Sequence, residues 1–142
     1  MTTTRPATTG STRSDVGETA GPRILLYSDD RTVRESVRLA VGSRLGKGQP
    51  RLEWLEVATA PEVVARAGEG WDLLVLDGEA DKVGGMGLCR QLKNEIYQCP
   101  PVLVLTGRPQ DAWLASWSLA DDVVSRPLDA VKVRETVTGM LA

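Results

Sequence analysis

Residues 72–77 of this chain read DLLVLD, and this stretch decides the fold. Four apolar residues, 73–76, follow one another without the polar residue at every second position that marks a half-exposed strand. Such a run is typical of a strand buried on both faces, as in a parallel sheet covered by helices. The run ends in Asp77, so we expect an acid at the carboxyl end of this strand.

Similar short runs lie on both sides of this strand in the sequence. They predict further strands at 24–27 (ILLY), 52–57 (LEWLEV), 102–105 (VLVL) and 122–125 (DVVS). Between the strands, apolar residues recur at helical spacing. The first such set runs from Val33 to Leu45, and the predicted helix ends at Gly46. Further helices are predicted over 61–67, 88–96, 110–119 and 133–141. Five alternating units predict an α/β fold, a five-stranded doubly wound parallel sheet with five flanking helices.

The start of the chain has a different composition. Residues 1–21 are rich in threonine and glycine and contain a single valine. Such a segment cannot bury enough apolar surface to offset the entropy lost on ordering. We therefore expect residues 1–21 to form a flexible tail and residues 22–142 to form one domain.

Composition excludes several classes of function. The chain is 42% apolar and 25% charged, with a net charge of −2, which is a globular balance without the basic excess of a nucleic-acid-binding protein. Its apolar runs are too short for a membrane span or a signal peptide, so we expect a cytoplasmic protein with no direct membrane insertion. The absence of histidine excludes catalytic triads and imidazole metal ligands. Cys89 and Cys99 are expected to be free thiols.

Reactive side chains cluster at the predicted strand ends. In a doubly wound sheet the functional site lies beyond the carboxyl ends of the strands. Those ends carry Asp29 and Asp30 after the first strand, Asp77 after the third, Thr106 after the fourth and Arg126 after the fifth. Converging carboxylates favour a bound hard cation such as Mg²⁺. A hydroxyl and a guanidinium beside them are suited to a phosphoryl group.

Four segments occur in the order found in one known family. They are ILLYSDDRTVR (24–34), DLLVLD (72–77), VLVLTG (102–107) and ADDVVSRPL (120–128). Over about 120 of its 142 residues, the chain resembles the receiver domains of bacterial two-component response regulators. The resemblance implies a flavodoxin-like sheet and a stand-alone signalling module, not a metabolic enzyme.

The resemblance also implies roles for single residues. Asp77 falls on the phosphoacceptor, which in the family is phosphorylated by its own catalysis, and Thr106 falls on the switch hydroxyl. Asp29 falls on an acid that holds Mg²⁺ together with Asp77, and Glu79 on the residue whose backbone carbonyl joins them. Pro127 falls on a proline that often follows a cis peptide bond.

The pocket departs from the family pattern at two main positions. Ser28 stands where the first metal-binding acid is usual, which weakens the Mg²⁺ site, although Asp30 next to it could partly compensate. Arg126 replaces the usual lysine. An arginine there would either clamp a phosphate or pair permanently with Asp77, because its planar fork of donors differs from a lysine ammonium.

Two further residues are candidates for partner binding. Trp117 lies in the predicted fourth helix, on the side that the family uses for partners, and aromatic side chains are favoured anchors at interfaces. Val123 stands where the family usually has an aromatic residue on the fifth strand. The alternative is that Trp117 packs inward against a neighbouring helix.

Two hypotheses follow. The first is a single-domain receiver that acts by protein–protein contact, switched by phosphorylation at Asp77 with Mg²⁺ after meeting a histidine kinase. The alternative is a pseudo-receiver that serves as a constitutive accessory subunit or adaptor in a larger assembly, without phosphorylation. A buried pair between Arg126 and Asp77 would favour the alternative.

Overall fold

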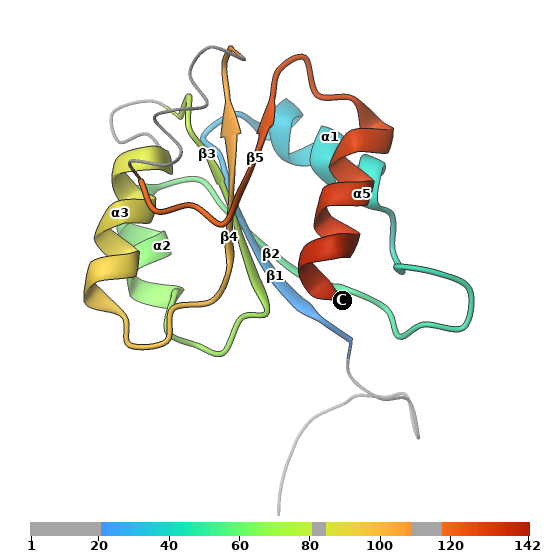
Figure 1. The fold of residues 1–142 in the computed structure, drawn as a ribbon, viewed down its shortest axis with the longest axis horizontal. Helices are drawn as coiled ribbons and strands as arrows, with labels where there is room; N and C mark the ends of the chain where they lie inside the picture. Colours follow the sequence, from blue (N-terminus) through green and yellow to red (C-terminus); the bar gives the residue numbers. More distant parts are fainter. Residues whose placement is uncertain (1–20, 81–84, 109–117) are drawn as a thin grey trace, which may run out of the picture.

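The computed structural model describes residues 21–80, 85–108 and 118–142. In these ranges five parallel strands form one sheet in the order β2-β1-β3-β4-β5 (Figure 1). The strands are β1 (Arg23–Tyr27), β2 (Glu53–Val57), β3 (Leu73–Asp77), β4 (Val102–Thr106) and β5 (Asp122–Ser125). The helices in these ranges are α1 (Arg31–Val41), α2 (Ala60–Arg66), α3 (Gly85–Glu95) and α5 (Ala130–Leu141).

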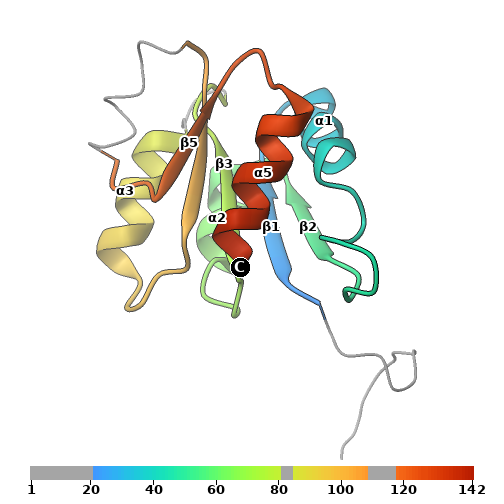
Figure 2. The ribbon, with the colours of Figure 1, turned by 45° about the vertical axis from the view of Figure 1, so that its right-hand side comes forward.

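This architecture confirms the predicted doubly wound parallel sheet. Helices α1 and α5 cover one face of the sheet, and α2 and α3 cover the other (Figures 1 and 2). The predicted helix over 110–119 lies mostly outside the described residues, so four of the five predicted helices are described. The predicted tail over 1–21 lies almost wholly outside them as well. Within the described ranges, no helix is long and apolar enough to span a bilayer.

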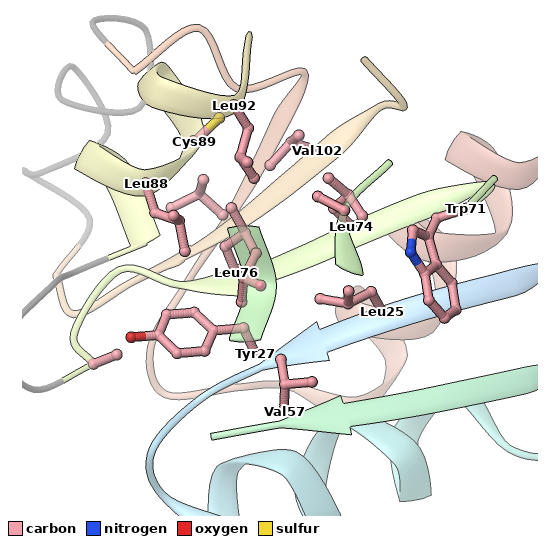
Figure 3. Packing of buried hydrophobic residues seen from close by; sticks show 14 residues of the cluster. Leu25, Tyr27, Val57, Trp71, Leu74, Leu76, Leu88, Cys89, Leu92 and Val102 are labelled. Carbon is pink, nitrogen blue, oxygen red and sulfur yellow. The ribbon is translucent and has the colours of Figure 1, made fainter. Parts of the chain in front are cut away.

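The strands are apolar on both faces because each face is covered. Figure 3 shows Tyr27, Leu74 and Leu76 on the side of the sheet that Leu88 and Leu92 of α3 cover. The alternate strand residues pack against α1 and α5 on the opposite face, and these are Ile24, Leu26, Leu73, Val75, Leu103 and Leu105. Burial on both faces explains the continuous runs in the sequence.

Helix α1 ends earlier than its apolar spacing predicts. It begins after Asp30, whose side chain accepts a hydrogen bond from the Thr32 N–H and caps the helix. It ends at Gly42, which has a φ of 83°, and not at Gly46. This left-handed conformation suits glycine and stops the helix. Leu45 still packs against the core, but from the loop that follows.

The two cysteines are free thiols, as expected. Cys89 lies buried in the cluster beneath α3, where burial raises the pKa of its thiol to about 11. Cys99 is half-buried, and burial raises its pKa as well. Both thiols therefore stay protonated near neutral pH and have little nucleophilic character.

A single arginine of α5 binds the end of α1. Arg134 donates hydrogen bonds to the carbonyl oxygen of Val41 and, at 2.6 Å, to that of Leu45. The last carbonyls of a helix lack partners within the helix, so a side chain from a neighbouring element can satisfy them. Arg134 thereby fixes α1 and its following loop against α5.

We predict that Arg134→Met lowers the free energy of unfolding by about 1–3 kcal/mol, because it leaves partly buried carbonyl oxygens without donors. Urea denaturation followed by circular dichroism measures the free energy of unfolding. Lys132→Met, at an exposed position of the same helix, is the control and is expected to change stability by about 0.5 kcal/mol or less. Equal losses in the two variants would contradict the role given to Arg134.

Candidate functional site

The carboxyl ends of the strands bring most of the predicted site residues to one edge of the sheet. Asp77 is the last residue of β3, and Thr106 is the last residue of β4 beside it. Ser28 directly follows β1, and Arg126 directly follows β5. Strands β1 and β3 are neighbours although β2 lies between them in sequence, so this edge contains the point where the strand order reverses.

Asp77 is the centre of this site. Its side chain is only 2% exposed, and both of its carboxylate oxygens accept hydrogen bonds. Oδ2 accepts from the Ser28 hydroxyl at 2.8 Å. Oδ1 accepts from Arg126 Nη2 at 2.6 Å and from the backbone N–H of Glu79 at 2.9 Å. A buried carboxylate needs such compensation, because burial removes its hydration.

Arg126 takes one of the two roles that the sequence left open for it. Its guanidinium pairs with Asp77 in a contact that reaches from the end of β5, across β4, to the end of β3. The side chain of Arg126 is 30% exposed, so the pair joins a partly exposed guanidinium to a buried carboxylate. The peptide bond between Arg126 and Pro127 is cis, as the resemblance implies.

Thr106 is buried beside Asp77, but its hydroxyl is turned toward β5. It hydrogen-bonds to the hydroxyl of Ser125 at 2.8 Å, and these two residues are also paired in the strand register. The sequence analysis missed Ser125. The signal that could have found it is its position at the carboxyl end of β5, level with Thr106 at the end of β4.

The remaining acidic candidates lie around the rim. Asp30 is fully exposed, and its carboxylate accepts hydrogen bonds from the side chain and backbone N–H of Thr32, which lower its pKa. Asp29 is exposed, and its charge acts on Tyr27. Burial is the main cause that raises the pKa of Tyr27, followed by the charges of Asp29 and Asp77.

Both the backbone and the side chain of Glu79 contact the site. Its N–H donates to Asp77, and its carboxylate lies against Gly107, which follows β4. A methyl group on Gly107 would lie 2.6 Å from the carboxyl carbon of Glu79. Glycine at this position therefore leaves room for the Glu79 side chain.

The donor set does not fit a divalent cation in this arrangement. The resemblance implies a Mg²⁺ site built from carboxylates, and Mg²⁺ favours an octahedral shell of oxygens. Here Ser28 supplies a hydroxyl in place of an acid, and Asp30 caps α1. Within the described ranges, no three acidic, histidine or cysteine side chains gather as a metal site would require. The guanidinium of Arg126 already neutralises Asp77.

Of the two partner-binding candidates, one lies within the described residues. Val123 lies on β5 with its side chain half-buried. Trp117 lies outside the described residues.

Comparison with known proteins finds relatives that are named as response regulators. No family model matches the chain. It is 51% identical over 120 residues to an uncharacterized response regulatory protein of Mycobacterium tuberculosis strain H37Rv, covering 84% of this chain and 90% of that one. It is 31% identical over 121 residues to the response regulator MprA of Mycobacterium leprae, of which it spans 50%.

Solved structures show the same fold. The signal receiver domain of a signal transduction histidine kinase from Syntrophus aciditrophicus superposes with a TM-score of 0.70 at 25% identity, covering 85% of this chain and 90% of that one. The chemotaxis response regulator CheY4 of Vibrio cholerae superposes with a TM-score of 0.70 at 18% identity, covering 86% and 100%.

We predict that Arg126→Met lowers the free energy of unfolding by about 2–3 kcal/mol, because it leaves the buried carboxylate of Asp77 without its cation. Chemical denaturation of the wild type, Arg126→Met, Asp77→Asn and the double variant gives a double-mutant cycle. The double variant is expected to lose less stability than the sum of the single variants, by about 1 kcal/mol or more. Strict additivity would mean that the pair contributes nothing to the fold.

Proposed function

Because this chain belongs to the receiver domains of bacterial response regulators, we propose that it transmits a signal by contact with a protein partner, with Arg126 setting the resting state of its pocket. Receiver domains are signalling proteins, not enzymes in the ordinary sense, and they interact with partners such as histidine kinases. The receiver domain in this proposal comprises residues 22–142.

The ion pair between Arg126 and Asp77 is the observation that carries the proposal. It joins the end of β3 to the residue after β5, and β5 leads through Pro127 into α5. A positive charge fixed on Asp77 holds the end of β5 in one position without any bound ion or phosphoryl group. The surface formed by β5 and α5 is then competent for binding in one constant arrangement.

In this mode the chain acts as a constitutive partner, as an adaptor or accessory subunit of a larger assembly does. Three features of the described pocket support it. Both oxygens of Asp77 have donors, Ser28 replaces an acid, and Asp30 is used as a helix cap. Each feature reduces the nucleophilicity of Asp77 or its access to a divalent cation.

Phosphorylation of Asp77 is the second candidate mode, and the hydrogen-bond donors around its carboxylate favour it. A phosphoryl group prefers hydroxyl and guanidinium donors, and Ser28, Thr106 and Arg126 lie at this edge. Transfer of a phosphoryl group from a phosphohistidine to one carboxylate oxygen of Asp77 would break the present pair, and the donor histidine would leave as a free imidazole. The same guanidinium would then face the new negative charge and could bind it. A histidine kinase would be the natural partner in this mode.

We predict that the wild type gains no phosphoryl group in Mg²⁺ and acetyl phosphate, because Arg126 occupies the acceptor carboxylate. The double variant Ser28→Asp with Arg126→Lys restores an acid and a lysine at the two divergent positions. We expect it to bind Mg²⁺ and to gain one phosphoryl group. Intact mass spectrometry measures phosphorylation, and isothermal titration calorimetry measures Mg²⁺ binding.

Asp77→Asn, alone and in the double variant, is the control that assigns any added group to this residue. Phosphorylation of the wild type and not of Asp77→Asn would reject the constitutive mode in favour of the second one. Failure of the double variant to bind Mg²⁺ would show that Ser28 and Arg126 are not what sets the metal affinity of the pocket.

A further inference from the structure

A second concave region lies away from the Asp77 pocket, between α1 and the outermost strand β2. It is a groove of about 830 Å³, lined chiefly by Arg31, Arg34, Arg38, Arg51, Trp54 and Glu56. Its charged residues are four arginines and two glutamates, on a chain whose net charge is −2. The groove is therefore a locally basic surface on an acidic protein, and such a surface favours an acidic partner.

One edge of β2 lies along this groove. Within the described residues β2 is an edge strand of the sheet, and β1 is the strand that pairs with it. The N–H of Glu53 donates to Pro22 at 2.9 Å, and the carbonyl of Val57 accepts from Ser28 at 3.3 Å. In a parallel ladder alternate residues bond to the same neighbour, so the backbone groups of Trp54 and Glu56 face outward.

These outward groups have no hydrogen-bond partner in the described part of the chain. The loop after α1 covers only the beginning of β2, where the Leu52 N–H donates to Ser43 at 2.9 Å. Beyond that point none of the described residues bonds to the outer edge of β2. An open edge offers an extended segment from another chain a set of main-chain hydrogen bonds.

The side chains beside this edge are arranged to receive acidic residues. The guanidinium of Arg38 lies 5.5 Å from the centre of the Trp54 ring and donates to Glu56 at 2.7 Å. This hydrogen bond is the main cause that lowers the pKa of Glu56. Arg31 is 80% exposed and pairs at 3.2 Å with Glu35, which is itself exposed, and Arg51 is exposed without an ion pair in the described ranges. Both arginines are therefore accessible from solvent.

The groove also has an apolar part. Leu39 of α1 is 84% exposed at its rim, and the half-buried ring of Trp54 forms part of its wall. A second copy of this chain that docked through the same groove would bring the same positive excess to the contact and would be repelled. The surface therefore suits a segment in which acidic and apolar residues alternate.

We propose that the groove between α1 and β2 is a docking site for an extended acidic segment of a protein partner, which adds to the sheet beside β2. Its main chain bonds to the free groups of Trp54 and Glu56. Its carboxylates face Arg31 and Arg51, and its apolar residues contact Trp54. The Arg126–Asp77 pair is not required, so this docking is independent of the function proposed for the pocket.

The test uses the full chain and a short, fluorescein-labelled peptide of alternating glutamate and valine, at low ionic strength. Fluorescence anisotropy is expected to show binding that weakens about tenfold in Arg31→Gln with Arg51→Gln. The matched control neutralises Arg66 on α2 and Lys132 on α5, both outside the groove, and is expected to bind as the wild type does. Added salt is expected to weaken binding.

Two further measurements test strand addition itself. Amide hydrogen exchange of Trp54 and Glu56 is expected to slow when the peptide binds. A peptide with the same side chains but N-methylated backbone amides is expected to bind at least about tenfold more weakly, because it cannot pair with β2. Both Arg→Gln changes are at exposed positions, so loss of folding is not expected and circular dichroism verifies it.

Several outcomes would overturn the proposal. Equal binding of a lysine–valine peptide would show that charge complementarity does not select the partner. An equal loss of peptide affinity in the control variant would show the same. Equal binding of the N-methylated peptide would mean contact without strand addition. Absence of binding at low ionic strength would reject the site altogether. None of these results depends on phosphorylation of Asp77, so the two proposals fail separately.

Discussion

A carboxylate at the end of a strand buried on both faces has to find compensation within the protein. Asp77 is in this position, because the apolar residues of β3 are covered by α2 and α3 on one side and by α1 and α5 on the other. The side chain of Asp77 is therefore only 2% exposed. The cation that compensates it comes from Arg126, at the far side of β4. Burial of β3 and the position of the chain after β5 are thus coupled through one ion pair.

Hydrogen bonds and an ion pair continue from the Asp77 pocket toward β2. Ser28 donates its hydroxyl to Asp77, and its backbone carbonyl accepts from Arg34 at 2.6 Å. Arg34 in turn pairs with Glu56 on β2 at 3.1 Å. These contacts form a continuous polar path from the pocket to the groove. The path shows contact and not signal transfer, since coupling would also require that its members have two arrangements.

The strands and the site edge were predictable because the underlying signals are local. Continuous apolar runs followed by polar residues fixed β1, β3 and β4 and placed Asp77 and Thr106 at one edge. The end of α1 was not predictable from spacing, because Leu45 keeps the helical period while contacting the core from a loop. The choice between the two roles of Arg126 depended on which atoms a long side chain reaches in three dimensions, and sequence spacing contains no such information.

The arginines beside β2 have a simpler explanation that has to be weighed against docking. Natural proteins protect exposed edge strands with charged side chains, which discourage aggregation. Protection alone would favour a polar surface throughout, yet Leu39 is 84% exposed at the rim and the ring of Trp54 lies beside the open backbone groups. Apolar side chains at that place make an edge more adhesive, not less. Combined with basic residues they select among partners, because the charges repel another basic edge and attract an acidic one. The combination is therefore better explained as a selective binding edge than as a protected one.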